Sequence, residues 1–245
     1  MTRWIDSAAI LIGVFALWYL AWWGAGDSAI TPPGHTLRFV VYLFGTDDFW
    51  GHAWATVRAF LYALAISAVI GIALGLALGL HRFSGEVMEP VLASFYTIPK
   101  VTLYPLMLLV FGLGISAKVA FGVIHGMIPV TLFTLAAVKN IPGVLIRTGH
   151  AMRLTPMATA RHVLMPAVMP EIISGLRIGF ALTFLGVLIG EMFASQRGLG
   201  FLIINGINQH DVRRTTAVIV IVVTAAVIAN SALLALDRHA RHEAT

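Results

Sequence analysis

The sequence contains no cysteine, and only 11% of its residues are charged. Without cysteine there is no disulfide, no thiolate nucleophile and no cysteine ligand for a metal. The charged fraction lies far below the roughly 25% of a soluble domain. In its place, 59% of the residues are hydrophobic and the mean hydropathy is +0.89. This composition indicates a chain that lies in a lipid bilayer.

The sequence also lacks repeated runs of about ten alternating apolar and polar residues, which favours a helical bundle over an outer-membrane barrel. A helix needs about 20 residues to cross some 30 Å of hydrocarbon. Six stretches approach or exceed that length: 7–23, 53–80, 90–112, 119–138, 168–194 and 216–236. We therefore predict an all-α, polytopic bundle of six transmembrane helices that forms a single domain over residues 1–245. We expect the first stretch to be a retained span and not a cleaved signal peptide.

The basic residues predict the orientation, because lysine and arginine accumulate in cytoplasmic loops. With the N-terminus inside, the cytoplasmic bases are Arg3, Arg82, Lys139, Arg147, Arg153, Arg161, Arg238 and Arg241. The bases on the outside or at that interface are Arg38, Arg58, Lys118, Arg197, Arg213 and Arg214. We expect both termini in the cytoplasm, together with the basic connection between the fourth and fifth spans.

Small residues recur every four positions along the second predicted span. They are Ala59, Ala63, Ser67, Gly71, Gly75 and Gly79. In lipid, such a ridge lets a second helix approach closely enough for backbone contacts. The second helix could belong to the same chain or to another copy, and the sequence leaves both readings open.

Few ionisable residues lie inside the predicted spans. Lys100 stands about half-way across the third span, between Pro99 and Pro105, where an ammonium costs ~2.5 kcal/mol or more. It could attract an anionic solute, pair with a neighbouring subunit, or extend along a broken helix toward water. Glu191 lies near the outer end of the fifth span. It could be a gate residue or an acid that forms hydrogen bonds between helices. His125 has no second ligand one helical turn away, so we expect neither a metal nor a cofactor.

Between the fourth and fifth spans, residues 139–166 form a basic connection. Six of its residues can form a short amphipathic helix: Met152, Arg153, Met157, Ala160, Arg161 and Leu164. Pro166 and Pro170 are expected to end that helix and to start the next one at a new angle. Such a helix could lie on lipid headgroups or dock into a groove on a cytoplasmic partner.

The run ARHVLMPAVMPEIISGLRIGF, followed by GEMFASQRGLGFLI, resembles the permease subunits of binding-protein-dependent ABC importers. It is most similar to the group for nitrate, taurine and aliphatic sulfonates, with relatives for pyrimidine precursors of thiamine. The resemblance extends from about residue 53 to 237. It implies a type I importer fold in a bacterial inner membrane, two ATPase subunits, a second permease copy or paralogue, an extracytoplasmic solute-binding protein, contact with membrane lipid, and no nucleic acid.

The resemblance also implies roles for particular residues. The connection 139–166 would be the coupling loop, seated in a cleft of the ATPase through Arg147, Gly149, Met152, Arg153, Met157, Arg161 and Pro166. Lys100 and Glu191 are the candidates for the translocation pathway or gate. Two family positions differ here, because Arg147 stands in place of the usual glutamate and Arg153 in place of the usual glycine. Residues 99–103 also differ from the nitrate and sulfonate group, so we assign no solute.

Two other classes compete with the permease. An ion-coupled secondary transporter would use Lys100, His125 and Glu191 as relay groups or counter-ions. An intramembrane enzyme would need a nucleophile beside a base, and no motif links Ser67 or Ser94 to His125. No glycine-rich phosphate loop precedes any lysine, so we expect no catalytic residue here and ATP hydrolysis on a separate chain.

Overall fold

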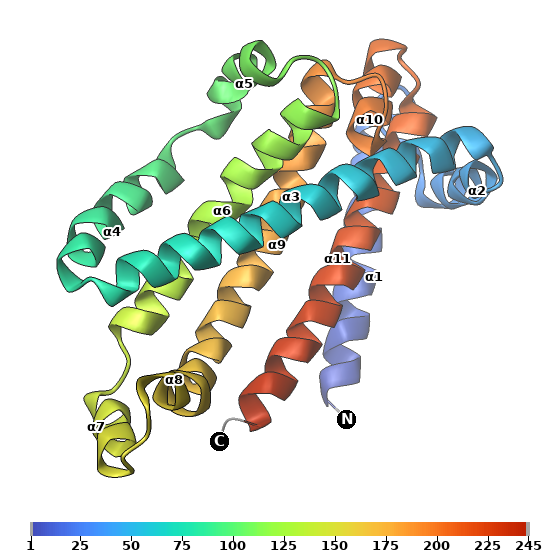
Figure 1. Ribbon diagram of the computed structural model, residues 1–245. Helices are drawn as coiled ribbons and strands as arrows, with labels where there is room; N and C mark the ends of the chain where they lie inside the picture. Colours follow the sequence, from blue (N-terminus) through green and yellow to red (C-terminus); the bar gives the residue numbers. More distant parts are fainter. Residues whose placement is uncertain (1, 244–245) are drawn as a thin grey trace.

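The computed structural model describes residues 2–243, which are mostly helical and contain no strand in that range. Figure 1 shows long helices side by side, with short helices at both ends. In chain order the elements are α1 (Thr2–Ala25), α2 (Pro33–Phe44), α3 (Asp47–Leu80), α4 (Arg82–Thr97), the 3-10 turn η1 (Lys100–Leu103), α5 (Tyr104–Phe111), α6 (Ile115–Lys139), α7 (Gly143–Ala151), α8 (Pro156–Thr159), the π-turn η2 (Ala160–Leu164), α9 (Met165–Ala194), α10 (Leu199–Asn208) and α11 (Val212–Glu243).

Helix α6 is the centre of the bundle and packs between α3 and α9. In its apolar window 61% of the residues are buried, against 17% for the window of α11. The glycines of α3 face α6 directly. A Cβ atom added there would lie within 2.7 Å of a side chain, where Gly71 meets Val130, Gly75 meets Thr134 and Gly79 meets Val138. The small-residue ridge therefore packs inside this chain and lets α3 and α6 approach closely.

Four helices are long and apolar enough to cross a membrane: Asp47–Leu80, Ile115–Lys139, Pro156–Phe193 and Val212–Ala235. The predicted span at 90–112 is interrupted in the structure. Phe83–Thr97 and Lys100–Phe111 meet at an angle of 86°. The residue before a proline avoids the α conformation, and Ile98 before Pro99 is extended at φ −64° and ψ 133°. Together the two helices make at most one broken span.

The first predicted span coincides with α1, which packs loosely. Among the residues described in side-chain detail its apolar part is Ile12–Ala25, which is shorter than the roughly 20 residues that a helix needs to cross a bilayer. The structure therefore does not reproduce the count of six spans. The indole nitrogen of Trp18 donates a hydrogen bond to the carbonyl of Thr31 at 3.1 Å, which ties α1 to the segment before α2.

The amphipathic helix predicted over 152–164 is also wrong. Helix α7 ends at Ala151, and the chain turns at Arg153, which has a φ of +52°. The hydroxyl of Thr155 then accepts a hydrogen bond from the amide of Ala158 at 3.2 Å and caps a new helix, α8. The segment is therefore a helix hairpin.

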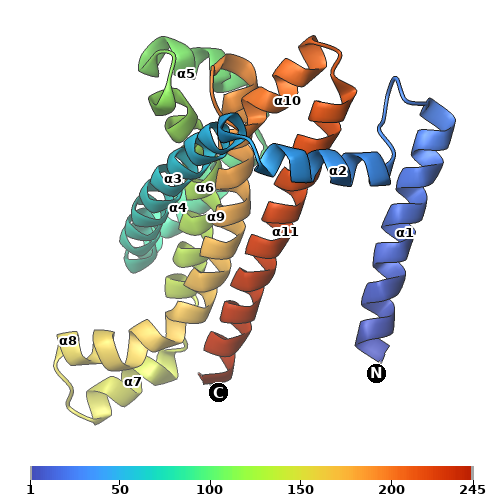
Figure 2. The same cartoon turned by 90° about the vertical axis from the view of Figure 1, so that its right-hand side faces the viewer.

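The new helix does not end at Pro166 as predicted, because α8, η2 and α9 run as one helix over Pro156–Phe193, which has 38 residues. The predicted change of direction is present, since α8 lies at a wide angle to the upright part of α9 (Figure 2). A proline ring inside a helix collides with the carbonyl one turn earlier. The π-turn relieves this collision, since the amide of Met165 bonds to the carbonyl of Ala160, five residues back.

The two ends of the bundle differ in what they carry (Figures 1 and 2). Helices α7 and α8 lie at the same end as the start of α1 and the end of α11. We call this the inner end, and residues 140–164 the inner segment. Helices α5 and α10 and the loop before α10 lie at the opposite, outer end.

Candidate functional site

Glu191 lies near the outer end of α9 and has no exposed surface. Its Oε2 accepts a hydrogen bond from the hydroxyl of Thr56 at 2.8 Å and another from the amide of Gly200 at 3.0 Å. Its Oε1 lies 3.7 Å from the ammonium nitrogen of Lys118. A carboxylate without access to water is costly unless it is paired and hydrogen-bonded, and these three groups offset that cost, although Oε1 itself accepts no hydrogen bond.

The loop 195–198 is fixed to Glu191 by its backbone. Gly198 has a φ of +132°, where side chains are rarely tolerated, and a Cβ atom at this position would overlap the carboxylate of Glu191. The amide of the next residue, Leu199, donates to the hydroxyl of Thr56 at 2.8 Å. Glycine at 198 thus lets the backbone close over the acid. We call Thr56, Lys118, Glu191, Gly198 and Gly200 the outer polar cluster.

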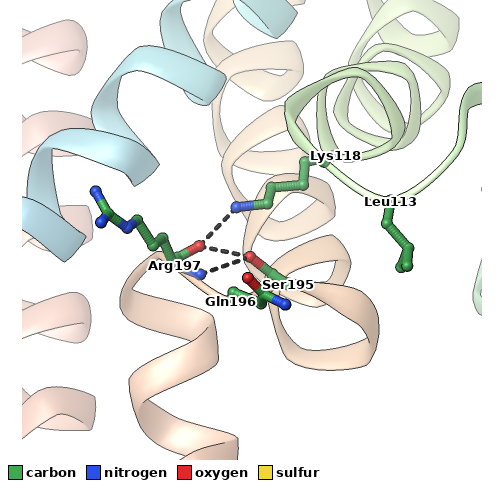
Figure 3. A pocket seen from close by; sticks show the side chains of 6 residues that line it. Leu113, Lys118, Ser195, Gln196 and Arg197 are labelled. Atoms are coloured by element: carbon green, nitrogen blue, oxygen red, sulfur yellow. Dashed lines mark hydrogen bonds between the residues drawn. The ribbon is translucent and has the colours of Figure 1, made fainter.

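Lys118 joins the same loop from α6 and is only 5% exposed. Its ammonium donates a hydrogen bond to the carbonyl of Arg197 at 2.6 Å, and Ser195 donates to that same carbonyl at 2.6 Å (Figure 3). These residues line a cavity of about 570 Å³ together with Leu113, Gly114 and Gln196. The guanidinium of Arg197 points away from the other labelled side chains (Figure 3). The charge that faces the loop is therefore that of Lys118.

A second layer of polar contacts surrounds the outer polar cluster. Nδ1 of His52 accepts a hydrogen bond from the amide of Gly198 at 3.1 Å, and Nε2 lies 3.5 Å from a carboxylate oxygen of Asp48. Asp48 also pairs with Arg214 of α11 at 3.0 Å. The ring of His52 stacks on Phe201. The layer connects α3, α10 and α11 around the loop.

At the inner end, the candidate coupling residues lie mostly in water. Arg147, Arg153 and Arg161 are exposed, and Met152 and Met157 are exposed by 64% and 77%. Among residues 2–243, the side chains of these arginines have no hydrogen-bond or ion-pair partner.

Two other candidates at the inner end shape the hairpin. Gly149 is buried, and a Cβ atom there would come within 2.6 Å of the side chain of Thr159. The two arms of the hairpin can pack together because this position has no side chain. Pro166 lies in the first turn of α9, just beyond the π-turn.

The remaining predicted residues lie apart from the outer polar cluster. Lys100 stands at the break between α4 and α5, where its ammonium donates to the carbonyl of Tyr96 at 3.3 Å and lies 5.0 Å from the centre of that ring. His125 is buried and hydrogen-bonded through Nδ1 to the carbonyl of Phe121 at 2.9 Å. Glu191 therefore pairs with Lys118 and not with Lys100.

Sequence reasoning missed the partners of Glu191. Charge counting places Lys118 on the outside or at that interface, and no sequence pattern marks Thr56. The sequence does indicate the pairing with Lys118. The predicted fourth span starts next to Lys118 and the predicted fifth span ends near Glu191, so both residues are expected at the same depth at the outer face of the membrane. Within the described residues, no group of three histidine or carboxylate side chains could hold a metal ion.

Comparison with known proteins gives consistent matches. Residues 67–242 match the family described as the binding-protein-dependent transport system inner membrane component. The taurine transport system permease protein TauC of Escherichia coli is 26% identical over 214 residues, which cover 82% of this chain and 78% of that protein. The riboflavin transport system permease protein RibX of Chloroflexus aurantiacus is 32% identical over 202 residues, which cover 80% of this chain and 75% of that protein.

A solved structure has the same fold. In an inward-facing form of the methionine ABC transporter MetNI, one chain aligns with a TM-score of 0.60 at 20% identity. The alignment covers 76% of this chain and 93% of the other. At that identity the likeness concerns the fold alone.

Proposed function

Because the chain belongs to the family of binding-protein-dependent transport system inner membrane components, we propose that its inner segment is the surface through which an ATPase subunit drives it. The chain is the membrane-embedded permease subunit of an ABC importer. Membership of this family favours the permease over an ion-coupled carrier built on Lys100, His125 and Glu191. The family is one of transport permeases, and ATP hydrolysis belongs on a partner chain.

One observation carries the proposal. The exposed hairpin of the inner segment continues without a break into the helix Pro156–Phe193, whose other end carries Glu191. Thirty residues separate Arg161 from Glu191, which corresponds to about 45 Å of helix at 1.5 Å per residue. A force on the hairpin would therefore reach the outer polar cluster through one continuous helix, which bends between α8 and the upright part of α9 (Figure 2). Rigid-body movement of this kind is a common way to switch a protein between two states.

The charge of the inner segment describes the partner surface that would fit it. Arg147, Arg153 and Arg161 are solvated bases without a partner in the described chain. Complementary charge across an interface steers association and fixes register. The matching ATPase cleft is therefore acidic at its rim, with an apolar floor for Met152 and Met157. An acidic rim also accounts for arginine where the family usually has glutamate.

At the other end, the outer polar cluster is the gate element. Glu191 and Lys118 hold the loop 195–200 against α3 and α6 and seal this end of the pathway when they are paired. Lys100 is the second candidate for the pathway, because it stands where a span is interrupted and is only partly buried. An ammonium in that place favours an anionic or polar solute.

The complete assembly contains two ATPase subunits at the inner end and a second permease copy or paralogue beside this chain. A solute-binding protein delivers the solute at the outer end. Both termini then face the cytoplasm with the inner segment. Taurine and riboflavin, which the relatives carry by name, differ in chemistry, so the proposal names no solute.

A photo-crosslinker at Met157 tests the proposal in the purified transporter assembly. Met157 is 77% exposed, so the substitution should leave the fold intact. We expect a covalent adduct with an ATPase subunit. The matched control is Phe193, which is 62% exposed near the other end of the same helix and should give no such adduct. Adducts of Met157 with lipid only, in every nucleotide state, would overturn the assignment.

A further inference from the structure

Helix α2 runs across the bundle and not along it. Figure 2 shows it nearly perpendicular to α1 and α11, below the outer ends of both. It has 12 residues and begins at Pro33, in the first turn, where proline fits a helix best. Its length, about 18 Å at 1.5 Å per residue, is too short to span a bilayer.

One face of α2 belongs to the protein core. Thr36 and Leu43, seven residues apart and hence on one side of the helix, are buried. Phe39 and Val40 are half-buried and pack on the cluster that contains Leu202 and other residues of α10 and α11. This packing fixes the rotation of α2 about its own axis.

A second face is apolar but uncovered. Leu37, Val41 and Phe44 are spaced by four and three residues and therefore lie on one side. Their exposed fractions are 46%, 72% and 45%. Contiguous apolar surface of this kind marks an interaction site in a folded protein.

A third face is polar. His35, Arg38 and Tyr42 are spaced by three and four residues, and all are exposed. The side chains of His35 and Arg38 have no hydrogen-bond or ion-pair partner among the described residues. At about 100° per residue, the centre of this face lies roughly 125° around the helix from the centre of the apolar one.

These three faces fit one environment. In water the apolar face would stay exposed, and in hydrocarbon Arg38 would be buried without a partner. At the boundary between headgroups and acyl chains both faces are satisfied, as in helices that lie in the plane of a membrane. Exposed Trp50 and Trp54 follow directly at the start of α3, and tryptophan is enriched at this level of the bilayer.

We propose that α2 lies in the outer-end leaflet of the membrane and binds anionic phospholipid, with Arg38 at the phosphate and Leu37 and Val41 among the acyl chains. We choose an anionic lipid because the polar face of α2 contains a base, Arg38, and no acidic residue. The helix thereby joins loosely packed α1 to the bundle at a fixed depth. The competing occupant is a soluble protein docked on the same face.

The absence of cysteine makes the experiment direct. Single cysteines at Leu37, Arg38, Val41 and Tyr42 are spin-labelled in the full chain and reconstituted into vesicles of phosphatidylglycerol and phosphatidylethanolamine. We expect labels at positions 37 and 41 to collide preferentially with oxygen, which partitions into lipid. Labels at positions 38 and 42 should collide preferentially with a water-soluble nickel chelate. Equal access of the chelate to all four positions would place α2 in water and overturn the proposal.

Measuring how much lipid the protein retains distinguishes specific binding of an anionic lipid by Arg38 from simple burial of α2 in the membrane. Native mass spectrometry of Arg38→Gln should show phosphatidylglycerol bound about fivefold less than in the parent protein, since one base near an anionic surface is lost. The matched control is Arg213→Gln, an exposed base at the same end of the bundle, which should retain lipid as the parent does. Unchanged retention in Arg38→Gln, or an equal loss in the control, contradicts the assignment of Arg38.

Discussion

The charged side chains in the outer polar cluster of this permease are buried and paired, whereas those of the inner segment are exposed. At the outer end Glu191 and Lys118 are 0% and 5% exposed. Each forms a hydrogen bond with the backbone of residues 195–200. At the inner end Arg147, Arg153 and Arg161 are exposed and unpaired within the described chain. The charged groups of the outer polar cluster have their partners within the protein, whereas the bases at the inner end face solvent.

The contrast has a physical reason. A buried ion pair contributes little net stability compared with apolar packing, but breaking it is costly, so it fixes a geometry. Exposed bases contribute almost nothing to the stability of the chain itself. Variants of the buried charges at the outer end should therefore affect folding and closure, and variants of the exposed bases at the inner end should affect coupling alone. The predictions below run from the largest expected effect on stability to the smallest.

Gly198→Ala should have one of the largest effects, comparable with loss of the buried ion pair below. The new methyl group would overlap the carboxylate of Glu191, and the φ of +132° is itself unfavourable, so we expect a loss of about 3 kcal/mol or more. Thermal unfolding in detergent measures it. The control is Gly114→Ala, with a similar φ of +146° but nothing within 4 Å. The control should lose about 1–2 kcal/mol, and equal losses would mean that the loop does not close on Glu191.

Glu191→Gln and Lys118→Met should each destabilise the protein by about 3–5 kcal/mol, because each leaves one buried charge without its counter-charge. The double variant removes both charges and should recover much of that loss. Chemical or thermal unfolding of all four proteins gives the coupling energy. Simple additivity of the two losses would show that the two groups do not act as a pair.

Gly149→Ala tests the packing of the inner hairpin, since a Cβ atom would meet Thr159. We expect a loss of about 1–2 kcal/mol, because Thr159 can shift partly out of the way. Hydrogen exchange should show the opening confined to residues 143–164. Gly143→Ala, with nothing within 4 Å of its Cβ, is the control and should stay as protected as the parent. Opening that spreads to the outer end would remove the distinction between the two regions.

Arg147→Ala and Arg161→Ala should change the free energy of unfolding by less than about 0.5 kcal/mol, as exposed substitutions do. Solute-stimulated ATP hydrolysis by the assembly should nevertheless fall severalfold, since complementary charge is lost at the ATPase interface. Arg213→Ala at the outer end is the control and should retain full hydrolysis. Unchanged coupling in both inner variants would count against the inner segment as the contact.

Hydropathy predicted the long spans, because the hydropathy of a span is a property of consecutive residues in the sequence. Pro99 and Pro105 indicate a weakened helix within 90–112, but the angle between its two parts could not be predicted, because the sequence around the prolines fits a straight helix and a bent one equally well. Helix α2 was missed because 12 residues fall below any spanning length. Glu191 was identified by its depth, but its partner Thr56 lies 135 positions away in the chain. Such pairings follow from helix packing, which a single sequence does not display.

The hairpin shows a further limit. The apolar and basic residues of 152–164 fit a helix by spacing, but Arg153 turns the chain at a φ of +52°. The proline at 166 was expected to end a helix, and the π-turn accommodates it instead. Local patterns therefore identified the segment and its charge, and the tertiary structure decided its shape.

The central claim is that nucleotide-driven movement of the inner segment reaches the outer polar cluster through the helix Pro156–Phe193. Gln196→Cys reports on it, because Gln196 is exposed in the loop beside Glu191 and the chain has no other cysteine. In the assembly, the rate at which a water-soluble thiol reagent labels this residue should differ between the ATP-bound and nucleotide-free states. The difference should vanish when Arg147, Arg153 and Arg161 are all replaced by alanine. Equal rates in both nucleotide states, or a difference that survives the triple replacement, would contradict the account.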